Sequence, residues 1–228
     1  MTQALSRTHL RQPTLKHTVP LKVIAVGDSL IYGFGDVEGG GWVDRLRRQW
    51  MQAEGPILYN LGVRGDTVRH VSQRLESEFR HRGELRHQVP DQMILSVGIN
   101  DSARLGRLEG RNMTPFPEFQ TRMADLLDRA SQLCPVTFIG MAPVDETKMP
   151  FLDAFFFNHE DQHLYNEVTR LACQERQIPF LDLFDLWRQR DQAWCQSQMS
   201  DDGLHPNSQG YQALLQDVMA WSAFQQFC

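Results

Sequence analysis

A serine occupies the turn that leaves an apolar segment near the start of the chain. Residues 23–26 are uncharged and mostly β-branched, which is typical of a strand buried on both faces of a parallel sheet. The segment breaks at Gly27, Asp28 and Ser29, and open α/β sheets place their ligands at this carboxyl end of their strands. A serine after a strand is often only a turn or cap residue. A catalytic role for Ser29 therefore depends on partners elsewhere in the chain.

A carboxylate and an imidazole lie three residues apart near the end of the sequence. Asp202 and His205 precede the last predicted helix, and Gly203 and Pro206 restrict the turn that holds them together. A serine needs a base to become nucleophilic, and a histidine needs an acid that fixes its tautomer. His205 and Asp202 supply both functions if their loop folds over the sheet edge where Ser29 lies.

Two other strand-end loops carry hydrogen-bond donors suited to a developing negative charge. Gly65 follows a predicted strand at residues 57–61, and Asn100 follows one at residues 93–97. Because parallel strands end at the same edge, we expect these loops to converge on Ser29. The backbone N–H groups of Ser29 and Gly65 and the side-chain amide of Asn100 are then candidates for an oxyanion hole.

Each of these residues also has a purely structural explanation when it is taken singly. His205 suits a cap or a core position, Asp202 a turn, Asn100 an Asx-turn, and Gly65 a backbone with positive φ. Their joint occurrence on strand-end loops, together with an Asp-x-x-His pair, favours catalysis.

The elements that must position these residues alternate between strand and helix. Such alternation is the signature of βαβ units with right-handed crossovers, so it predicts one parallel sheet of about five strands. In the fourth helix, an apolar stripe of Leu164, Val168 and Leu171 predicts the buried face. The predicted strands are 23–26, 57–61, 93–97, 136–140 and 179–183, and the predicted helices are 42–50, 68–79, 117–133, 160–176 and 208–221.

One segment departs from this alternation because it concentrates large apolar side chains between a proline-bearing loop and a helix cap. So many such side chains are not expected on an exposed loop. They either pack as ordinary core or form the wall of an apolar substrate pocket near the site. The residues are Met149, Phe151, Phe155, Phe156 and Phe157.

The length and composition narrow the class of protein. At 228 residues the chain suits one domain, and we expect a loosely ordered lead-in at residues 1–20 followed by a single domain at 21–228. A net charge of -5 without a basic block argues against nucleic acid as a partner. No apolar run approaches the roughly 20 residues of a membrane span, so integral membrane association is not expected.

The cysteines and the start of the chain indicate a cytoplasmic protein. Residues 1–20 lack the continuous apolar core of a secretory signal. The four cysteines form no C-x-x-C pair, so we expect reduced thiols without a zinc site. No metal or other cofactor is expected, and the sequence does not indicate an oligomeric state.

The candidate residues fall in four blocks that resemble those of the SGNH hydrolases, also called GDSL-type lipases and esterases. The order of the blocks also matches that family, and together they span nearly the whole chain. They read Gly-Asp-Ser-Leu at 27–30, Asn-Leu-Gly-Val-Arg-Gly-Asp-Thr at 60–67, Gly-Ile-Asn-Asp at 98–101 and Asp-Gly-Leu-His-Pro at 202–206.

The resemblance implies a flavodoxin-like α/β/α sandwich that carries a serine hydrolase without a cofactor. It assigns Ser29 as nucleophile, His205 as base and Asp202 as its orienting acid, with Gly65 and Asn100 completing the oxyanion hole. Asp28 and Asp101 would support their loops. Members of the family act on thioesters, lysophospholipids, aryl esters and acetylated sugars. From the phenylalanine-rich segment we expect a small-molecule acyl ester or thioester of short to medium chain length.

Two other functions compete with this interpretation. A metal-dependent phosphoesterase could use Asp28, Asn100, Asp202 and His205 as ligands, although Ser29 would then have no role. A non-catalytic binding domain is the other alternative, but every catalytic role is filled by a suitable residue.

Overall fold

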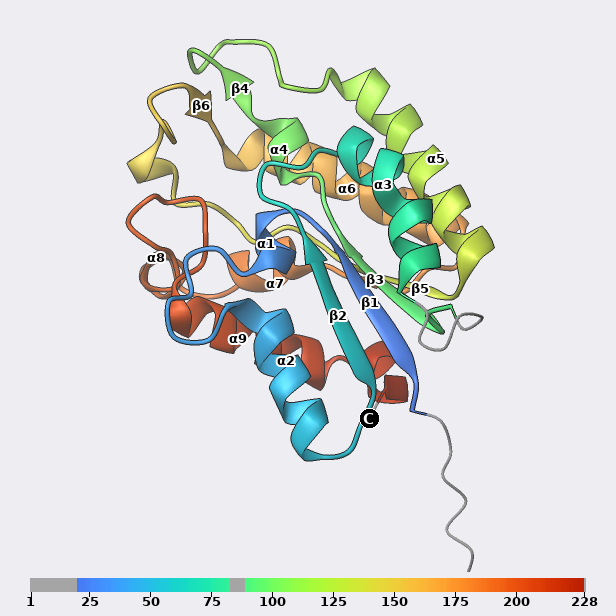
Figure 1. Ribbon diagram of the computed structural model, residues 1–228. Helices are drawn as coiled ribbons and strands as arrows, with labels where there is room; N and C mark the ends of the chain where they lie inside the picture. The colour runs from blue at the N-terminus through green and yellow to red at the C-terminus, as the bar shows by residue number, and fades with distance from the viewer. Residues whose placement is uncertain (1–19, 83–88, 228) are drawn as a thin grey trace, which may run out of the picture.

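A five-stranded parallel sheet lies at the centre of the protein (Figure 1). The computed structural model describes residues 20–82 and 89–227, so the predicted lead-in lies outside the described residues except for Pro20, as does Cys228. The strand order is β2-β1-β3-β5-β7, which is the flavodoxin-like order when the five strands are counted along the chain. The predicted α/β/α sandwich is confirmed. Its strands are β1 (Lys22–Gly27), β2 (Ile57–Gly62), β3 (Gln92–Ser96), β5 (Val136–Ile139) and β7 (Phe180–Leu181).

β1 lies between β2 and β3 in the sheet, and all six of its residues are buried. It pairs in parallel with β2 on one side and β3 on the other, so that Val26 lies opposite both Leu61 and Leu95. This position explains the uncharged, β-branched sequence of the segment. It also places the loops after β1, β2 and β3 at one edge of the sheet.

Helices cover both faces of the sheet and form two separate cores (Figure 1). Along β1, Ile24 and Val26 pack into one core, and Val23 and Ala25 pack into the other, as alternation along a strand requires. The first core contains α3 (Val68–His81), α5 (Phe116–Leu133) and α6 (His159–Glu175). The second contains α1 (Ser29–Tyr32), α2 (Gly41–Gln52), α7 (Leu183–Arg188) and α9 (Ser208–Ala220). The short helices are α4 (Ile99–Ser102), η2 (Glu146–Lys148), α8 (Gln192–Ser197) and η3 (Ser222–Phe227).

The prediction of the buried face of α6 is wrong for two of its three residues, because only Val168 packs against the first core. Leu164 and Leu171 are 45% and 44% exposed. The helix instead turns a largely polar face inward, and this face carries Asp161, Gln162, Tyr165, Asn166, Thr169 and Cys173.

The polar groups on this face are hydrogen-bonded to the loops that α6 covers. The Tyr165 hydroxyl donates to the Thr114 carbonyl at 2.6 Å. The Gln162 side chain donates to the Ala142 carbonyl at 3.0 Å and accepts from the Val144 N–H at 3.1 Å. The helix therefore satisfies backbone groups of buried loops that have no partner in the sheet, which an apolar stripe could not do.

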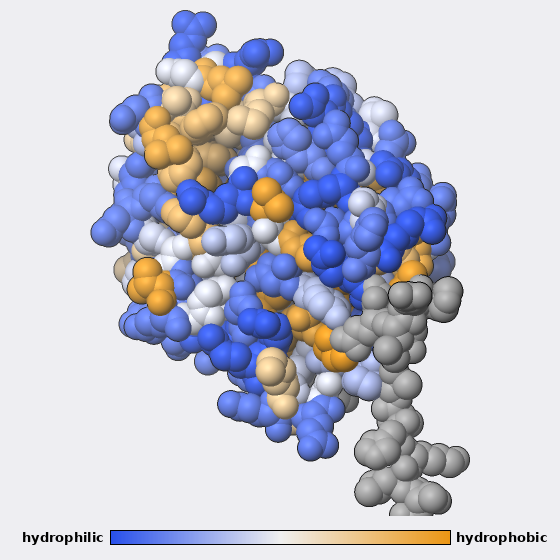
Figure 2. Space-filling view, viewed as in Figure 1, coloured by the Kyte–Doolittle hydropathy of each residue, from blue (hydrophilic) through white to orange (hydrophobic). Residues whose placement is uncertain are grey.

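A small antiparallel pair of strands, β4 (Arg104–Leu105) and β6 (Phe155–Phe156), was not predicted. It stands beyond the carboxyl edge of the sheet, and Figure 2 shows hydrophobic surface gathered over this part of the molecule. Leu108 and Leu152 are among the exposed apolar residues there. Along the described ranges, no helix is long and apolar enough to cross a bilayer.

Replacing Tyr165 with phenylalanine tests the polar face of α6. We expect a loss of about 1–3 kcal/mol in the free energy of unfolding, because the buried Thr114 carbonyl loses its donor. Leu171→Ala is the control, with an expected change within about 0.5 kcal/mol, because Leu171 is half-exposed. Urea denaturation measures both. A larger loss at Leu171 would restore the predicted apolar face.

Candidate active site

The structure brings Ser29, His205 and Asp202 into one hydrogen-bonded row. Ser29 is the first residue of α1, and its Oγ lies 2.9 Å from Nε2 of His205. Nδ1 of His205 lies 2.7 Å from Oδ2 of Asp202. The side chains come from loops 176 residues apart in the chain, and Ser29 and His205 are buried.

The ionisation of Asp202 determines which ring nitrogen of His205 carries the hydrogen. Burial acts to raise the pKa of Asp202, but hydrogen bonds from the ring and backbone of His205 and from the Leu204 N–H outweigh it, so the pKa is lowered. An ionised Asp202 accepts a hydrogen bond from Nδ1–H, which leaves Nε2 as the acceptor for the Ser29 hydroxyl. This is the tautomer that a general base requires.

The backbone of the 202–206 loop is fixed by local contacts. Oδ1 of Asp202 accepts from the N–H groups of Leu204 and His205, both at 3.0 Å. Gly203 has φ +69°, and a Cβ there would lie 2.7 Å from Cβ of Lys148. Only glycine therefore fits this turn, which sets the reach of His205 toward Ser29.

Aromatic rings contact the imidazole of His205 from two segments. Phe34, in the loop after α1, meets it edge-on with ring centroids 4.7 Å apart. Phe151, in the segment before β6, does the same at 5.7 Å. These contacts restrict rotation of the ring and keep water from its faces.

Gly65 and Asn100 line the same cavity as Ser29 and His205, and its volume is about 380 Å³. The Asn100 amide donates one hydrogen to the Asp66 carbonyl at 2.9 Å, which fixes the side chain and leaves the second N–H for a ligand. Gly65 has φ +79° and open space where a Cβ would lie. The N–H of Ser29 is in the first turn of a helix, where no intrahelical acceptor exists. The three predicted donors thus border one cavity.

The predicted supporting carboxyl groups, Asp28 and Asp101, are buried beneath the site. Asp28 caps α1 by accepting from the Leu30 N–H at 3.0 Å. Burial, with a further contribution from the charges of Asp101 and Asp66, raises the pKa of Asp28 to about 7. Asp28 therefore fixes the start of α1 and does not contact the reacting row.

Asp101 ties the loop after β3 to two other segments. One carboxyl oxygen accepts from the Val68 N–H at 2.9 Å, and the other accepts from the Thr114 hydroxyl at 2.6 Å. Burial raises the pKa of Asp101 to about 6, and these hydrogen bonds limit the shift. The carboxyl group thus joins the start of α3 to the short helix α4, which carries Asn100.

Arg74 also connects two of these loops by hydrogen bonds, which the sequence did not indicate. Its Nε donates to Asp66 at 2.8 Å, and its Nη2 donates to the Gly27 carbonyl at 2.9 Å. Because Asp66 also accepts from Asn100, the loops after β1, β2 and β3 are joined through one guanidinium and one peptide unit.

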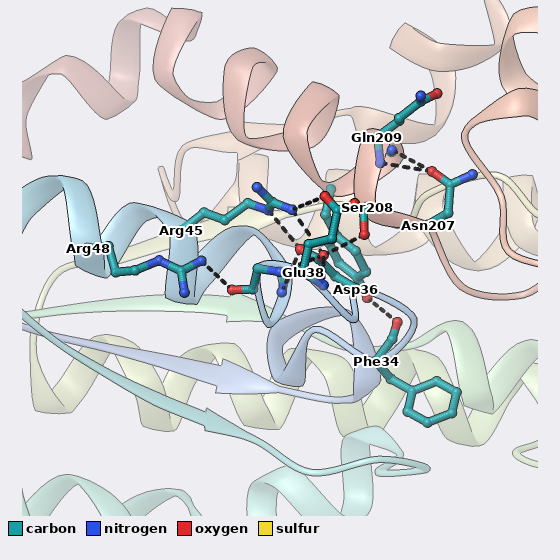
Figure 3. Close-up of polar contacts among 12 residues, drawn as sticks. Phe34, Asp36, Glu38, Arg45, Arg48, Asn207, Ser208 and Gln209 are labelled. Carbon is teal, nitrogen blue, oxygen red and sulfur yellow. Dashed lines mark hydrogen bonds and ion pairs between the residues drawn. The ribbon is translucent and has the colours of Figure 1, made fainter.

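Hydrogen bonds to Asp36 also connect the loop after α1 to the start of α9, which follows His205 (Figure 3). Its buried carboxylate accepts from Nε of Arg45 at 2.7 Å and from the Ser208 hydroxyl at 2.8 Å, and it also accepts from N–H groups of the 38–41 loop. Burial alone would raise its pKa, but the hydrogen bonds from Arg45, Ser208 and the backbone hold the pKa of Asp36 well below its usual range. Asp36 and Ser208 are 172 residues apart, and no local sequence pattern links them.

The predicted pocket residues divide between two cavities. Phe151, Phe155 and Phe157 line the cavity that contains Ser29. Met149 and Phe156 do not line it, and this corrects their prediction. They border a separate cavity of about 500 Å³ with Arg104 and Leu108, which Phe157 also reaches. For Phe156 the reason is the strand β6, because neighbouring side chains such as Phe155 and Phe156 point to opposite sides of a strand.

Within residues 20–82 and 89–227, no group of three or more His, Cys, Asp or Glu side chains is placed to hold a metal ion. Asp202 and His205 are instead hydrogen-bonded to each other, and His205 is also hydrogen-bonded to Ser29. The described cysteines, Cys134, Cys173 and Cys195, carry free thiols.

Comparison with known proteins gives a consistent family. The family model for GDSL-like lipases/acylhydrolases matches residues 25–213. An uncharacterized protein of Bacillus subtilis, YpmR, is 23% identical over 222 residues, which cover 90% of this chain and 81% of the relative. The GDSL esterase/lipase WDL1 of Oryza sativa subsp. japonica is 23% identical over 208 residues, which cover 88% of this chain and 76% of the relative.

Solved structures share the fold. The lipase/acylhydrolase of Enterococcus faecalis superposes with a TM-score of 0.69 at 21% identity, covering 87% of this chain and 93% of that one.

The raised pKa of Asp28 predicts a pH dependence of stability. A carboxyl group with a raised pKa in the folded state favours folding when it is protonated, and this contribution is lost as the pH rises from about 4 to about 7. Asp28→Asn does not titrate. We therefore expect the free energy of unfolding of the wild type to fall relative to the variant over this range, by up to about 4 kcal/mol.

Chemical denaturation of both proteins across this pH range measures the difference. Asp101 titrates in both, so the difference between the two curves reports the carboxyl group at position 28 together with its coupling to Asp101. Curves that remain parallel would show that Asp28 has an ordinary pKa.

Proposed function

The chain belongs to the GDSL-like lipase/acylhydrolase family, and from this membership and the geometry above we propose that it is a serine ester hydrolase. It cleaves carboxylic esters or thioesters of short- to medium-chain acyl groups through an acyl-enzyme intermediate. The observation that carries the proposal is the position of His205, 2.9 Å from the Ser29 hydroxyl and 2.7 Å from the Asp202 carboxylate. Residues 21–228 form the single catalytic domain in this proposal.

Acylation begins when Oγ of Ser29 attacks the ester carbonyl and its proton passes to Nε2 of His205. The resulting imidazolium is stabilised by Asp202, which remains ionised. The carbonyl oxygen becomes an oxyanion that accepts from the N–H groups of Ser29 and Gly65 and from the Asn100 amide. Donors fixed beforehand, as the Asn100 amide is by Asp66, need no reorganisation at this step.

The intermediate collapses when His205 returns its proton to the leaving alcohol or thiol, and Ser29 retains the acyl group. A water molecule then attacks the acyl carbonyl while His205 takes its proton. Transfer of that proton to Oγ of Ser29 releases the carboxylic acid and restores the enzyme.

The cavity supports an acyl substrate of limited length. Its volume of about 380 Å³ lies within the usual range for small-ligand sites. Aromatic side chains at Phe151, Phe155 and Phe157 form an apolar wall near Ser29, which suits a hydrocarbon chain.

Covalent labelling tests the nucleophile. After exposure to a fluorophosphonate, we expect the intact mass of the wild type to increase by one adduct and that of Ser29→Ala to remain unchanged. The label should form at the same rate with and without EDTA, because no step uses a metal ion.

Asp202→Asn provides a second comparison. It keeps Ser29 and should still be labelled, but more slowly by roughly 10²-fold or more, because His205 loses the acid that orients it. An unlabelled wild type, or phosphatase activity that EDTA abolishes, would contradict the proposal.

The apolar wall predicts chain-length preference. Phe155→Ala enlarges the cavity, so we expect the kcat/KM ratio of p-nitrophenyl octanoate to butyrate to rise about tenfold. Phe156→Ala is the matched control, because the neighbouring side chain points into the other cavity. A change in ratio that is equal in the two folded variants would remove the wall from the acyl site.

A further inference from the structure

A single permanent charge borders the cavity that contains Ser29. Among the described residues that line it, Arg64 is the one arginine, and no lysine or carboxylate accompanies it. The remaining lining is the reacting groups, the candidate oxyanion donors and the apolar wall. This charge has no role in the proposed acyl transfer.

Arg64 is positioned by an aromatic ring. Its guanidinium carbon lies 3.5 Å from the centroid of Phe34, in a cation–π contact. Phe34 in turn contacts the ring of His205 edge-on. Arg64 therefore borders the cavity from the loop after β2 while resting on Phe34, and the phenylalanine wall comes from the segment around β6.

The charge of Arg64 is not balanced by a carboxylate in the described part of the chain, where it has no ion pair. The nearby carboxylate in sequence, Asp66, is already bound by Arg74. Arg64 is exposed, and its planar guanidinium presents N–H groups at its edges while one face rests on Phe34. A guanidinium held in this way suits bidentate binding of a carboxylate.

We propose that Arg64 binds a carboxylate on the leaving-group half of the substrate. The inference rests on the proposed function, because His205 must return a proton to the leaving oxygen and that oxygen therefore lies beside its ring. Arg64 is joined to that ring through Phe34, and the apolar wall also reaches it through Phe151. In this proposal Arg64 takes the leaving group and the wall takes the acyl chain. The substrate class is thus an acyl ester whose alcohol carries an acidic group a few bonds from the ester oxygen.

The experiment compares two esters that differ in charge on the leaving group. They are para-carboxyphenyl butyrate and its neutral isostere para-carbamoylphenyl butyrate, and each is tested on the wild type and on Arg64→Gln. We expect the variant to lose about tenfold in kcat/KM for the carboxylate ester, mainly through KM, as loss of one charge-assisted contact at an exposed site predicts. The neutral ester should change by less than about twofold, since its amide makes no ion pair.

Arg69→Gln is the matched control, because Arg69 is exposed on α3 and does not line the cavity. It removes the same charge and should behave as the wild type with both esters. Added salt should reduce the preference of the wild type for the carboxylate ester, because the contact is exposed.

Three results would overturn the assignment of Arg64. One is an equal loss for both esters, which would indicate a structural role. Another is no loss for either. The third is a preference that follows a carboxylate placed on the acyl half, tested with phenyl hydrogen glutarate and its primary amide. Failure of the proposed function is distinct, since the neutral ester would then show no hydrolysis that depends on Ser29, and this inference would fail with it.

Discussion

Parallel pairing of β1 with β2 and β3 is the constraint on which the rest of the structure depends. It brings the loops after β1, β2 and β3 to one edge of the sheet, and each loop carries one part of the candidate site. The buried strand β1 cannot shift its register without moving Val23 and Ala25 out of one core and Ile24 and Val26 out of the other. Hydrophobic packing on both faces of the sheet therefore sets the position of β1, and the Asp28 cap of α1 fixes Ser29 just beyond the end of this strand.

Packing alone does not fix the loops to one another, and buried carboxyl groups perform that task. Asp101 and Asp36 accept hydrogen bonds from segments that are distant in the sequence, and Asp66 holds Arg74, which also donates to the Gly27 carbonyl. A buried carboxyl group without partners would lower the free energy of unfolding by several kcal/mol. These hydrogen bonds therefore restrict the movement of the loops that they join. The pKa values of these carboxyl groups differ accordingly: burial raises the pKa of Asp101, whereas hydrogen bonds from Arg45, Ser208 and the backbone outweigh burial and lower the pKa of Asp36. A preorganised site results without a bound ligand.

Much of this arrangement could be predicted from the sequence because its signals are local. Each strand is a short apolar run, and each candidate residue follows a strand directly or, as with Asp202 and His205, stands within three residues of its partner. What could not be predicted depends on distant partners. The polar inner face of α6 exists because buried loops need Tyr165 and Gln162, and a search for apolar stripes selects the opposite face. Asp36 resembles any loop aspartate until Ser208 is placed beside it. Met149 and Phe156 are large and apolar like the residues of the wall, but they border the other cavity.

The distance in sequence between Ser29 and His205 determines when the pair can form during synthesis of the chain. The serine loop and the three strands around it are made first, yet the base that would activate the hydroxyl follows 176 residues later. Docking of α9, through Tyr211 on the Phe34 carbonyl and Ser208 on Asp36, is what brings that base into place. A nascent or misfolded chain that lacks this docking presents an ordinary, unreactive serine. Under the proposed function, a chain without this docking would lack the activated serine, so a test for a reactive Ser29 would also test whether α9 has docked.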